Sequence, residues 1–157
     1  MACICQFIEN CQAQHRQDLR VYRGAHQEWR NRLVHYIMIP VECFSFQLFI
    51  RGVGGTIVSS LVTVILATAS KTVAIQPTIG VASFMFHITS GWFAGMIVGA
   101  YDVKTALIIS VGCWAVAWAV QLGIGHYLLE KNSPNVANLR EVSYLAMCVS
   151  VLIAWSS

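Results

Sequence analysis

Long apolar runs alternate with short polar stretches along most of this chain, and that pattern predicts membrane-spanning helices. A helix needs about 20 mainly apolar residues to cross the hydrocarbon core of a bilayer, with a range of about 17 to 25. Runs of about this length cover residues 33–50, 53–70, 81–101, 105–128 and 139–155. The predicted fold is therefore all-α, a polytopic membrane helical bundle with about five hydrophobic segments.

The first of these segments, residues 33–50, contains Pro40 and Glu42. Proline in a helix removes one backbone donor and usually kinks the helix. This segment therefore either spans the bilayer or lies partly in its interface.

Composition supports the membrane assignment, because 57% of the residues are apolar and only 11% are charged, far from the usual soluble balance. At 157 residues, the length predicts a single domain over residues 1–157. Residues 1–32 form its N-terminal segment and residues 33–157 its helical membrane region.

Basic residues gather before the first apolar segment, although the net charge is only +3. An excess of arginine beside a hydrophobic stretch is a positive-inside signal, and residues 1–11 make a poor signal peptide, so we expect a cytosolic N-terminus. Nucleic-acid binding would need a broad basic face with exposed aromatics, so no nucleic-acid partner is predicted. The arginines are Arg16, Arg20, Arg23, Arg30 and Arg32.

Two polar stretches at opposite ends of the apolar region carry candidate chemistry: three histidines and one acid. They read Tyr22-x3-His26-x4-Asn31-x3-His35-x4-Pro40 and Gly125-His126-x3-Glu130-x3-Pro134. If all five segments cross the membrane, four crossings separate the two stretches, and an even number returns both to the same surface. Such a set of nitrogen and oxygen ligands suits non-heme iron, manganese or zinc. A metal site at a membrane surface is the leading hypothesis.

The local spacing bears on how each side chain would contribute. His126 and Glu130 are four residues apart, which places them on one helix face as two ligands or as a ligand and a general base. His26 and His35 are nine apart and would point to opposite sides of one continuous helix. A break between them is required, and we expect Asn31 to cap a helix that begins at residue 32.

Other interpretations stay open at this point. Any one of these histidines, taken alone, suits an interfacial position, and His87 in the third segment is either functional or hydrogen-bonded to a neighbouring helix. A non-catalytic scaffold or transporter would use Gly91-x3-Gly95-x3-Gly99 for close helix packing. A zinc-dependent membrane hydrolase is disfavoured because no HExxH motif is present.

The two stretches, together with Trp118-x2-Gln121, resemble the small membrane family named for the metabolism of phytosphingosine to odd-numbered fatty acids. Its best understood members are iron-dependent dioxygenases of 2-hydroxy fatty acids. The resemblance covers residues 22–40 and 118–138. Gln121 to His126 is one residue longer than the usual pattern, and Asn135 stands where a small apolar residue is common.

The resemblance implies an Fe(II)-dependent dioxygenase that shortens 2-hydroxy fatty acids by one carbon, in fatty acid alpha-oxidation and sphingoid base degradation. It implies Fe2+ ligation by His26, His35 and His126, with Glu130 as a further ligand or a catalytic group beside them. The partners would be the 2-hydroxy fatty acid, O2 and membrane lipid, and the location the endoplasmic reticulum. His87 matches no motif of the family.

Overall fold

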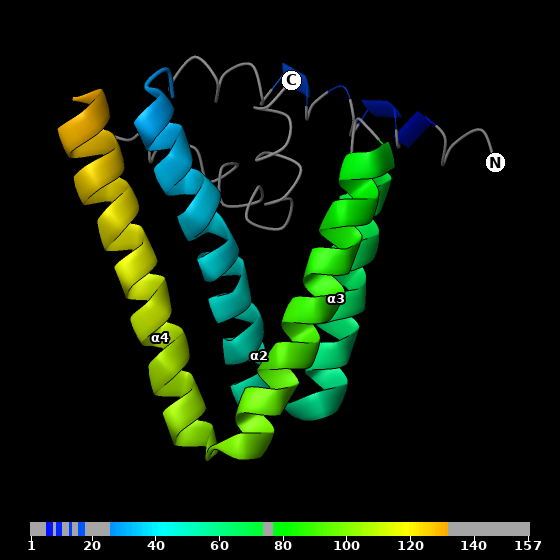
Figure 1. Ribbon diagram of the computed structural model, residues 1–157. Coiled ribbons are helices and arrows are strands. Elements are labelled where there is room, and N and C mark those ends of the chain that lie inside the picture. The colour runs from blue at the N-terminus through cyan, green and yellow to red at the C-terminus, as the bar shows by residue number, and fades with distance from the viewer. Residues whose placement is uncertain are drawn as a thin grey trace.

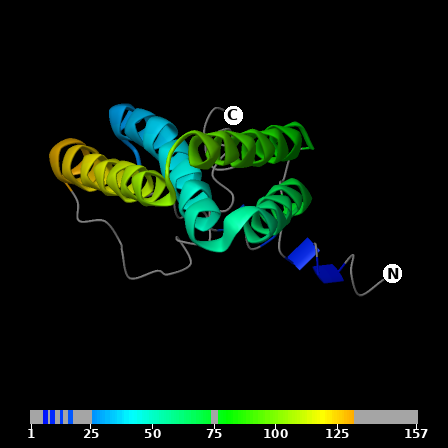
Figure 2. The same ribbon diagram turned by 90° about the horizontal axis from the view of Figure 1, so that it is seen from below.

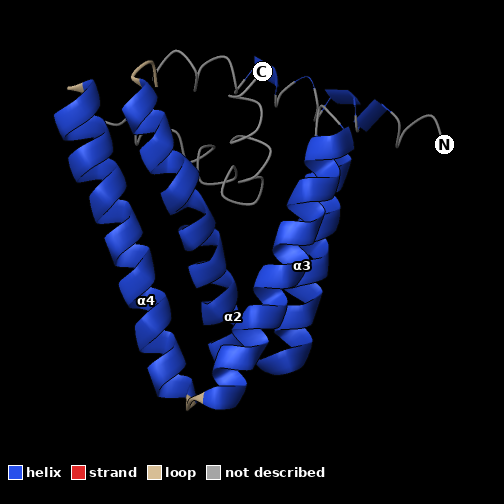
Figure 3. Cartoon of the chain, viewed as in Figure 1, coloured by secondary structure: helices blue, strands red, loops and turns tan. Residues whose placement is uncertain are grey.

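The computed structural model describes residues 6–7, 9–10, 13, 16–17, 26–73 and 77–131. The long helices among them are α2 (Trp29–Val73), α3 (Pro77–Ala100) and α4 (Val103–Val120), and α4 continues without interruption into the π-helix η1 (Gln121–Glu130). Figure 3 shows only helices and short connections in the described part of the chain. The predicted all-α fold is confirmed.

Helix α2 reverses direction at Gly55, where the backbone has φ 68° and ψ −168°. Glycine adopts such a positive φ without the steric cost that a Cβ would bring. A hydrogen bond proves the reversal, because Thr63 Oγ1 donates to Gln47 Oε1 at 3.2 Å. These residues would lie about 24 Å apart along a straight helix. The two arms of α2, residues 29–54 and 56–73, therefore form a helical hairpin (Figure 1).

The two arms of α2, helix α3 and helix α4 pack as two pairs that are joined at one end. The first arm of α2 lies beside α4, and the second arm lies beside α3, as both views show (Figures 1 and 2). Asp102 caps α4 at this joined end, since its carboxylate accepts a hydrogen bond from the Thr105 backbone N–H at 2.9 Å. The start of α2 and the end of η1 lie together at the opposite end of the bundle.

Three helices in the described part of the chain are long and apolar enough to cross a membrane: Trp29–Ala69, Gly80–Ala100 and Val103–Glu130. The count of about five segments is therefore not supported. The first of these three helices takes in both predicted segments 33–50 and 53–70, which lie on the two helical arms that meet at the kink at Gly55. The predicted segment 139–155 lies outside the described residues. Pro40 lies inside α2, so this proline does not end the helix.

A glycine on α3 lets this helix approach the second arm of α2 closely. A Cβ added at Gly91 would lie 2.6 Å from Thr63 Oγ1, whereas one at Gly99 would meet nothing within 4 Å. Buried Leu48, Ala94 and Ala106 form one core cluster across α2, α3 and α4. The glycine spacing at 91, 95 and 99 therefore serves tight packing mainly at its first position.

Candidate metal centre

Three histidines from distant parts of the chain converge where α2 begins and η1 ends. The ring centroids are 4.6 Å apart for His26 and His35, 4.9 Å for His26 and His126, and 5.3 Å for His35 and His126. His26 and His35 are buried, with 6% and 4% of their surface exposed, and His126 lies partly exposed at the rim. The structure thus brings together the three histidines that the sequence singled out.

The donor set fits a metal ion. One ring nitrogen from each histidine lies within 4.8 Å of the other two. Nitrogen ligands bind a transition metal at about 2.0–2.1 Å, so two ligands of one ion stand at most about 4.2 Å apart. Imidazole rotations that shift each nitrogen by less than about 1 Å would close the cluster to that spacing. The three histidines could therefore hold a metal ion, and because imidazole suits iron, zinc, copper and nickel alike, this geometry does not choose among them.

The break required between His26 and His35 is present but lies earlier than predicted. Residues 26–28 are non-helical and α2 begins at Trp29, so His26 approaches from outside the helix while His35 projects from it. Asn31 is therefore not the helix cap that we expected. It lies in the first turn of α2 with none of its surface exposed, and its side chain points to another element.

Glu130 joins the two ends of the site. Its Oε1 accepts hydrogen bonds from the Glu28 backbone N–H and from Asn31 Nδ2, both at 3.1 Å. These contacts tie the end of η1 to the residues between His26 and His35, and so they hold His126 beside its partners. The cluster of residues that can hold a metal contains the three histidines and not Glu130.

Gly125 permits this close approach of η1 to α2. The residue is buried, and a Cβ added there would collide with Asn31 Oδ1 and lie 3.7 Å from Val34 Cγ1. Any side chain at this position would push η1 away from the Asn31 amide. The glycine beside His126 therefore makes room for Asn31.

The π-helix η1 accounts for the extra residue between Gln121 and His126. A π-helix pairs residues five apart in its hydrogen bonding and occurs often at functional sites, so these two side chains share one face although they are five positions apart. Gln121 Nε2 donates to Glu42 Oε1 at 2.5 Å, and both residues are buried. The Gln121–Glu42 pair lies on the membrane side of the histidines, and sequence reasoning had assigned it no role.

The charged side chains Glu28 and Arg30 form an ion pair at the start of α2, close in sequence to His26. Arg30 Nε pairs with Glu28 Oε1 at 2.9 Å, and this hydrogen bond from Arg30 lowers the pKa of the Glu28 carboxyl from its ordinary value. Arg30 is thereby engaged locally. Arg32 and Lys131 are the other basic side chains near the cluster in the sequence, and Lys131 follows Glu130 directly in a left-handed conformation with φ 55°.

His87 lies apart from the cluster, between α3 and the hairpin of α2. Its Nδ1 is 3.2 Å from Gln47 Nε2, and the Gln47 carbonyl in turn accepts from Thr63. His87 and Gln47 are each 1% exposed. Of the two interpretations left open for His87, the hydrogen bond to a neighbouring helix is the one observed.

This fold and site define a class of protein, a helical bundle with membrane-length helices and a convergent histidine cluster. Within that class the chain belongs to the family described as 2-hydroxy-palmitic acid dioxygenase Mpo1-like, whose model matches residues 12–156. No curated protein and no solved structure matches the chain. The resemblance noted from the motifs is confirmed.

Proposed function

We propose that this protein is an Fe(II)-dependent dioxygenase that removes one carbon from 2-hydroxy fatty acids at the surface of the endoplasmic reticulum membrane, with a cytosolic N-terminus. The observation that carries the proposal is the convergence of His26, His35 and His126, with ligand nitrogens within 4.8 Å. Membership of a family named for 2-hydroxy-palmitic acid supports the substrate class.

The proposed reaction balances without an external reductant. A 2-hydroxy acid R–CH(OH)–COOH and O2 give R–COOH, CO2 and H2O, with the bond between carbons 1 and 2 broken and carbon 2 oxidised to the new carboxyl. Iron(II) bound by the three histidines would supply the open coordination positions for the hydroxy acid and the redox chemistry with oxygen. No other cofactor is needed for this stoichiometry.

The residues around the cluster would hold and orient the reacting groups. We propose that Arg32 and Lys131 attract the substrate carboxylate, because Arg30 is already paired with Glu28. Glu130 would fix His126 through its bonds to the residues at the start of α2, and its carboxylate is also the nearest candidate to accept a proton from the 2-hydroxyl.

The test uses the purified full chain, prepared without oxygen and reconstituted with Fe2+, Mn2+ or Zn2+ in turn. We expect one iron per chain and, with iron alone, conversion of 2-hydroxypalmitic acid and O2 to the acid one carbon shorter plus CO2. His26→Ala, His35→Ala and His126→Ala should each abolish the reaction. Tyr127→Phe changes an exposed neighbour of His126 (78% exposed) and should leave it unaffected.

Activity that is the same with and without metal, or full activity in all three histidine variants, would reject the assignment as an iron-dependent dioxygenase. Stoichiometric zinc with no oxygen consumption would instead favour a hydrolytic or structural metal site.

A further inference from the structure

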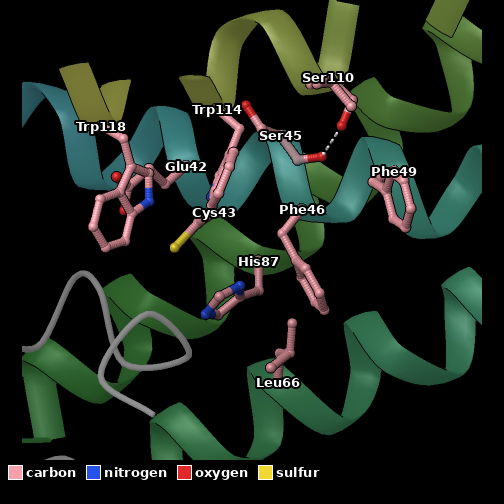
Figure 4. A pocket seen from close by; sticks show the side chains of 11 residues that line it. Glu42, Cys43, Ser45, Phe46, Phe49, Leu66, His87, Ser110, Trp114 and Trp118 are labelled. Atoms are coloured by element: carbon pink, nitrogen blue, oxygen red, sulfur yellow. Dashed lines mark hydrogen bonds between the residues drawn. The ribbon is translucent and has the colours of Figure 1, made fainter. Parts of the chain in front are cut away.

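A cavity of about 620 Å³ lies inside the bundle between the first arm of α2, its second arm and α4. Figure 4 shows aromatic and aliphatic side chains along its walls, and we use Trp118, Trp114, Phe46, Phe49 and Leu66 to mark its extent. Ligand pockets of roughly 300–1,000 Å³ hold small molecules and bury most of their surface. Nothing in the histidine chemistry accounts for this cavity.

The cavity starts close to the metal cluster and runs away from it. Glu42 and Trp118 lie at one end (Figure 4), and the bond from Gln121 to Glu42 connects that end to η1, which carries His126. Along the first arm of α2, Glu42 lies about 10 Å below His35 and Phe49 about 21 Å below it. The cavity therefore begins about 10 Å below His35 and runs toward the middle of the bundle.

Its lining chemistry suits a hydrocarbon. Four polar side chains reach the cavity wall, and each is hydrogen-bonded within the protein. Glu42 is bonded to Gln121 and His87 to Gln47, while the Ser45 and Ser110 hydroxyls donate to the backbone carbonyls of Val41 and Ser45. The aromatic walls offer apolar surface, and Phe46 and Trp114 are each 47% exposed. A polar ligand would find few hydrogen-bonding partners here. An alkyl chain would remove its apolar surface from water and would leave the hydrogen bonds of these four side chains intact.

The dimensions match one acyl chain. A bilayer hydrocarbon core of about 30 Å is made by two leaflets, so a membrane-forming acyl chain spans about 15 Å. With its carboxyl end at the histidines, such a chain passes Glu42 and ends about 15 Å below His35, near the level of residues 45 and 46. The cavity continues beyond that depth to Phe49 (Figure 4).

We propose that this cavity holds the alkyl chain of the 2-hydroxy fatty acid and sets the chain length that the protein accepts. The inference rests on the proposed function for the identity of the occupant. Phe49 would then bound the methyl end of the longest chains, Leu66 would contact the middle of the chain, and Trp118 would contact it nearer its carboxyl end (Figure 4).

Chain-length profiles test the proposal. Leu66→Trp should narrow the cavity and shift preference toward shorter 2-hydroxy acids, while Phe49→Ala should shift it toward longer ones. Each buried methylene is worth about a four-fold effect on binding, so excluding two methylenes should change the ratio of kcat/KM for long against short acids by about fifteen-fold. Ile65→Trp makes a similar substitution on the outer face of the same arm, where Ile65 is 55% exposed, and should leave the ratio unchanged.

Binding without turnover gives the second measurement. A variant with Trp29, Trp92 and Trp155 replaced by phenylalanine keeps only Trp114 and Trp118 of the five tryptophans. In iron-loaded protein without oxygen, a 2-hydroxy acid brominated near its methyl end should quench this fluorescence saturably, and the unbrominated acid should restore it.

The outcomes separate this inference from the proposed function. Wild-type protein that shortens 2-hydroxy acids, with the same chain profile in Leu66→Trp, Phe49→Ala and Ile65→Trp and no saturable quenching, would overturn the cavity assignment alone. If the protein shortens no acid but the brominated acid quenches its fluorescence and the unbrominated acid restores it, the acyl site would stand and the dioxygenase assignment would be rejected.

Discussion

Two buried histidine sites in the same bundle have different surroundings. His87 is a single ring held between helices by an amide, with Nδ1 3.2 Å from Gln47 Nε2. His26, His35 and His126 instead face one another, with ring centroids 4.6–5.3 Å apart. One buried histidine needs only one hydrogen-bonding partner to be tolerated, whereas three imidazoles gathered together repel one another whenever they are protonated. A shared cation is the simplest reason for the second arrangement.

The largest expected difference is in metal affinity between variants of the two sites. His35→Ala should lower iron affinity by more than about 100-fold, since loss of a ligand costs more than loss of the outer contacts, which typically cost 10–100-fold. His87→Ala removes an equally buried imidazole and should keep one iron per chain. Iron content after gel filtration and competition with a chelator measure both variants. Equal loss of iron in His35→Ala and His87→Ala would show that His87 is as important for iron binding as His35.

Glu130 is expected to have the next largest effect, and two substitutions separate its two proposed roles. Glu130→Ala breaks the hydrogen bonds to the Glu28 N–H and Asn31 and should weaken iron binding about 10–100-fold, as supporting contacts of metal ligands do. Glu130→Gln keeps an acceptor oxygen at the same place and should largely restore iron binding.

Turnover of Glu130→Gln then decides between positioning and proton transfer. Iron binding and activity that return together indicate positioning alone. Iron binding that returns while the rate stays at least about 100-fold low indicates a general base, because general acid–base catalysis typically contributes 10²–10⁴-fold. Normal iron affinity together with a normal rate in Glu130→Ala would show that the carboxylate does neither.

Sequence reasoning predicted the apolar helices and the convergence of the three histidines because both depend on signals carried by the residues themselves. Apolar runs mark membrane helices whatever they pack against, and the histidines stood in spaced motifs. It missed the role of Asn31 because capping preference is local, whereas the actual partner of its amide, Glu130, is 99 residues away. The expected break near Asn31 was right in kind, but the helix begins at Trp29, three residues earlier than predicted.

The reversal at Gly55 and the π-helix show two further limits. Hydropathy separated residues 33–50 from 53–70, but no hydropathy signal says that a glycine with positive φ folds the second helical arm back along the first. The extra residue between Gln121 and His126 was visible as a departure from the motif. Its consequence, a π-helical turn that restores the shared face, depends on packing against α2 and could not be deduced from spacing.

A smaller effect is expected at Gly125, where the histidine site depends on backbone approach. Gly125→Ala introduces a Cβ that collides with Asn31 Oδ1, and overpacking of this kind typically costs about 1–3 kcal/mol. We expect iron affinity to fall about ten-fold, within the range for residues that support ligands. Gly123→Ala, where a Cβ meets no atom within 4 Å of the described structure, is the matched control. Equal iron affinity in the two variants would show that the separation of η1 from α2 does not limit the site.

The smallest effect on metal binding should come from the His87 network, where the change falls on stability instead. Gln47→Met removes the partner of His87 and of Thr63 and should lower the free energy of unfolding by about 1–3 kcal/mol, the cost of leaving buried polar groups unsatisfied. Adding His87→Phe should recover part of that loss, since replacing both members of a buried pair with apolar groups is often nearly neutral. Iron content should stay at one per chain in both variants. If iron is lost in proportion to the loss of stability, the His87 network and the histidine cluster depend on each other.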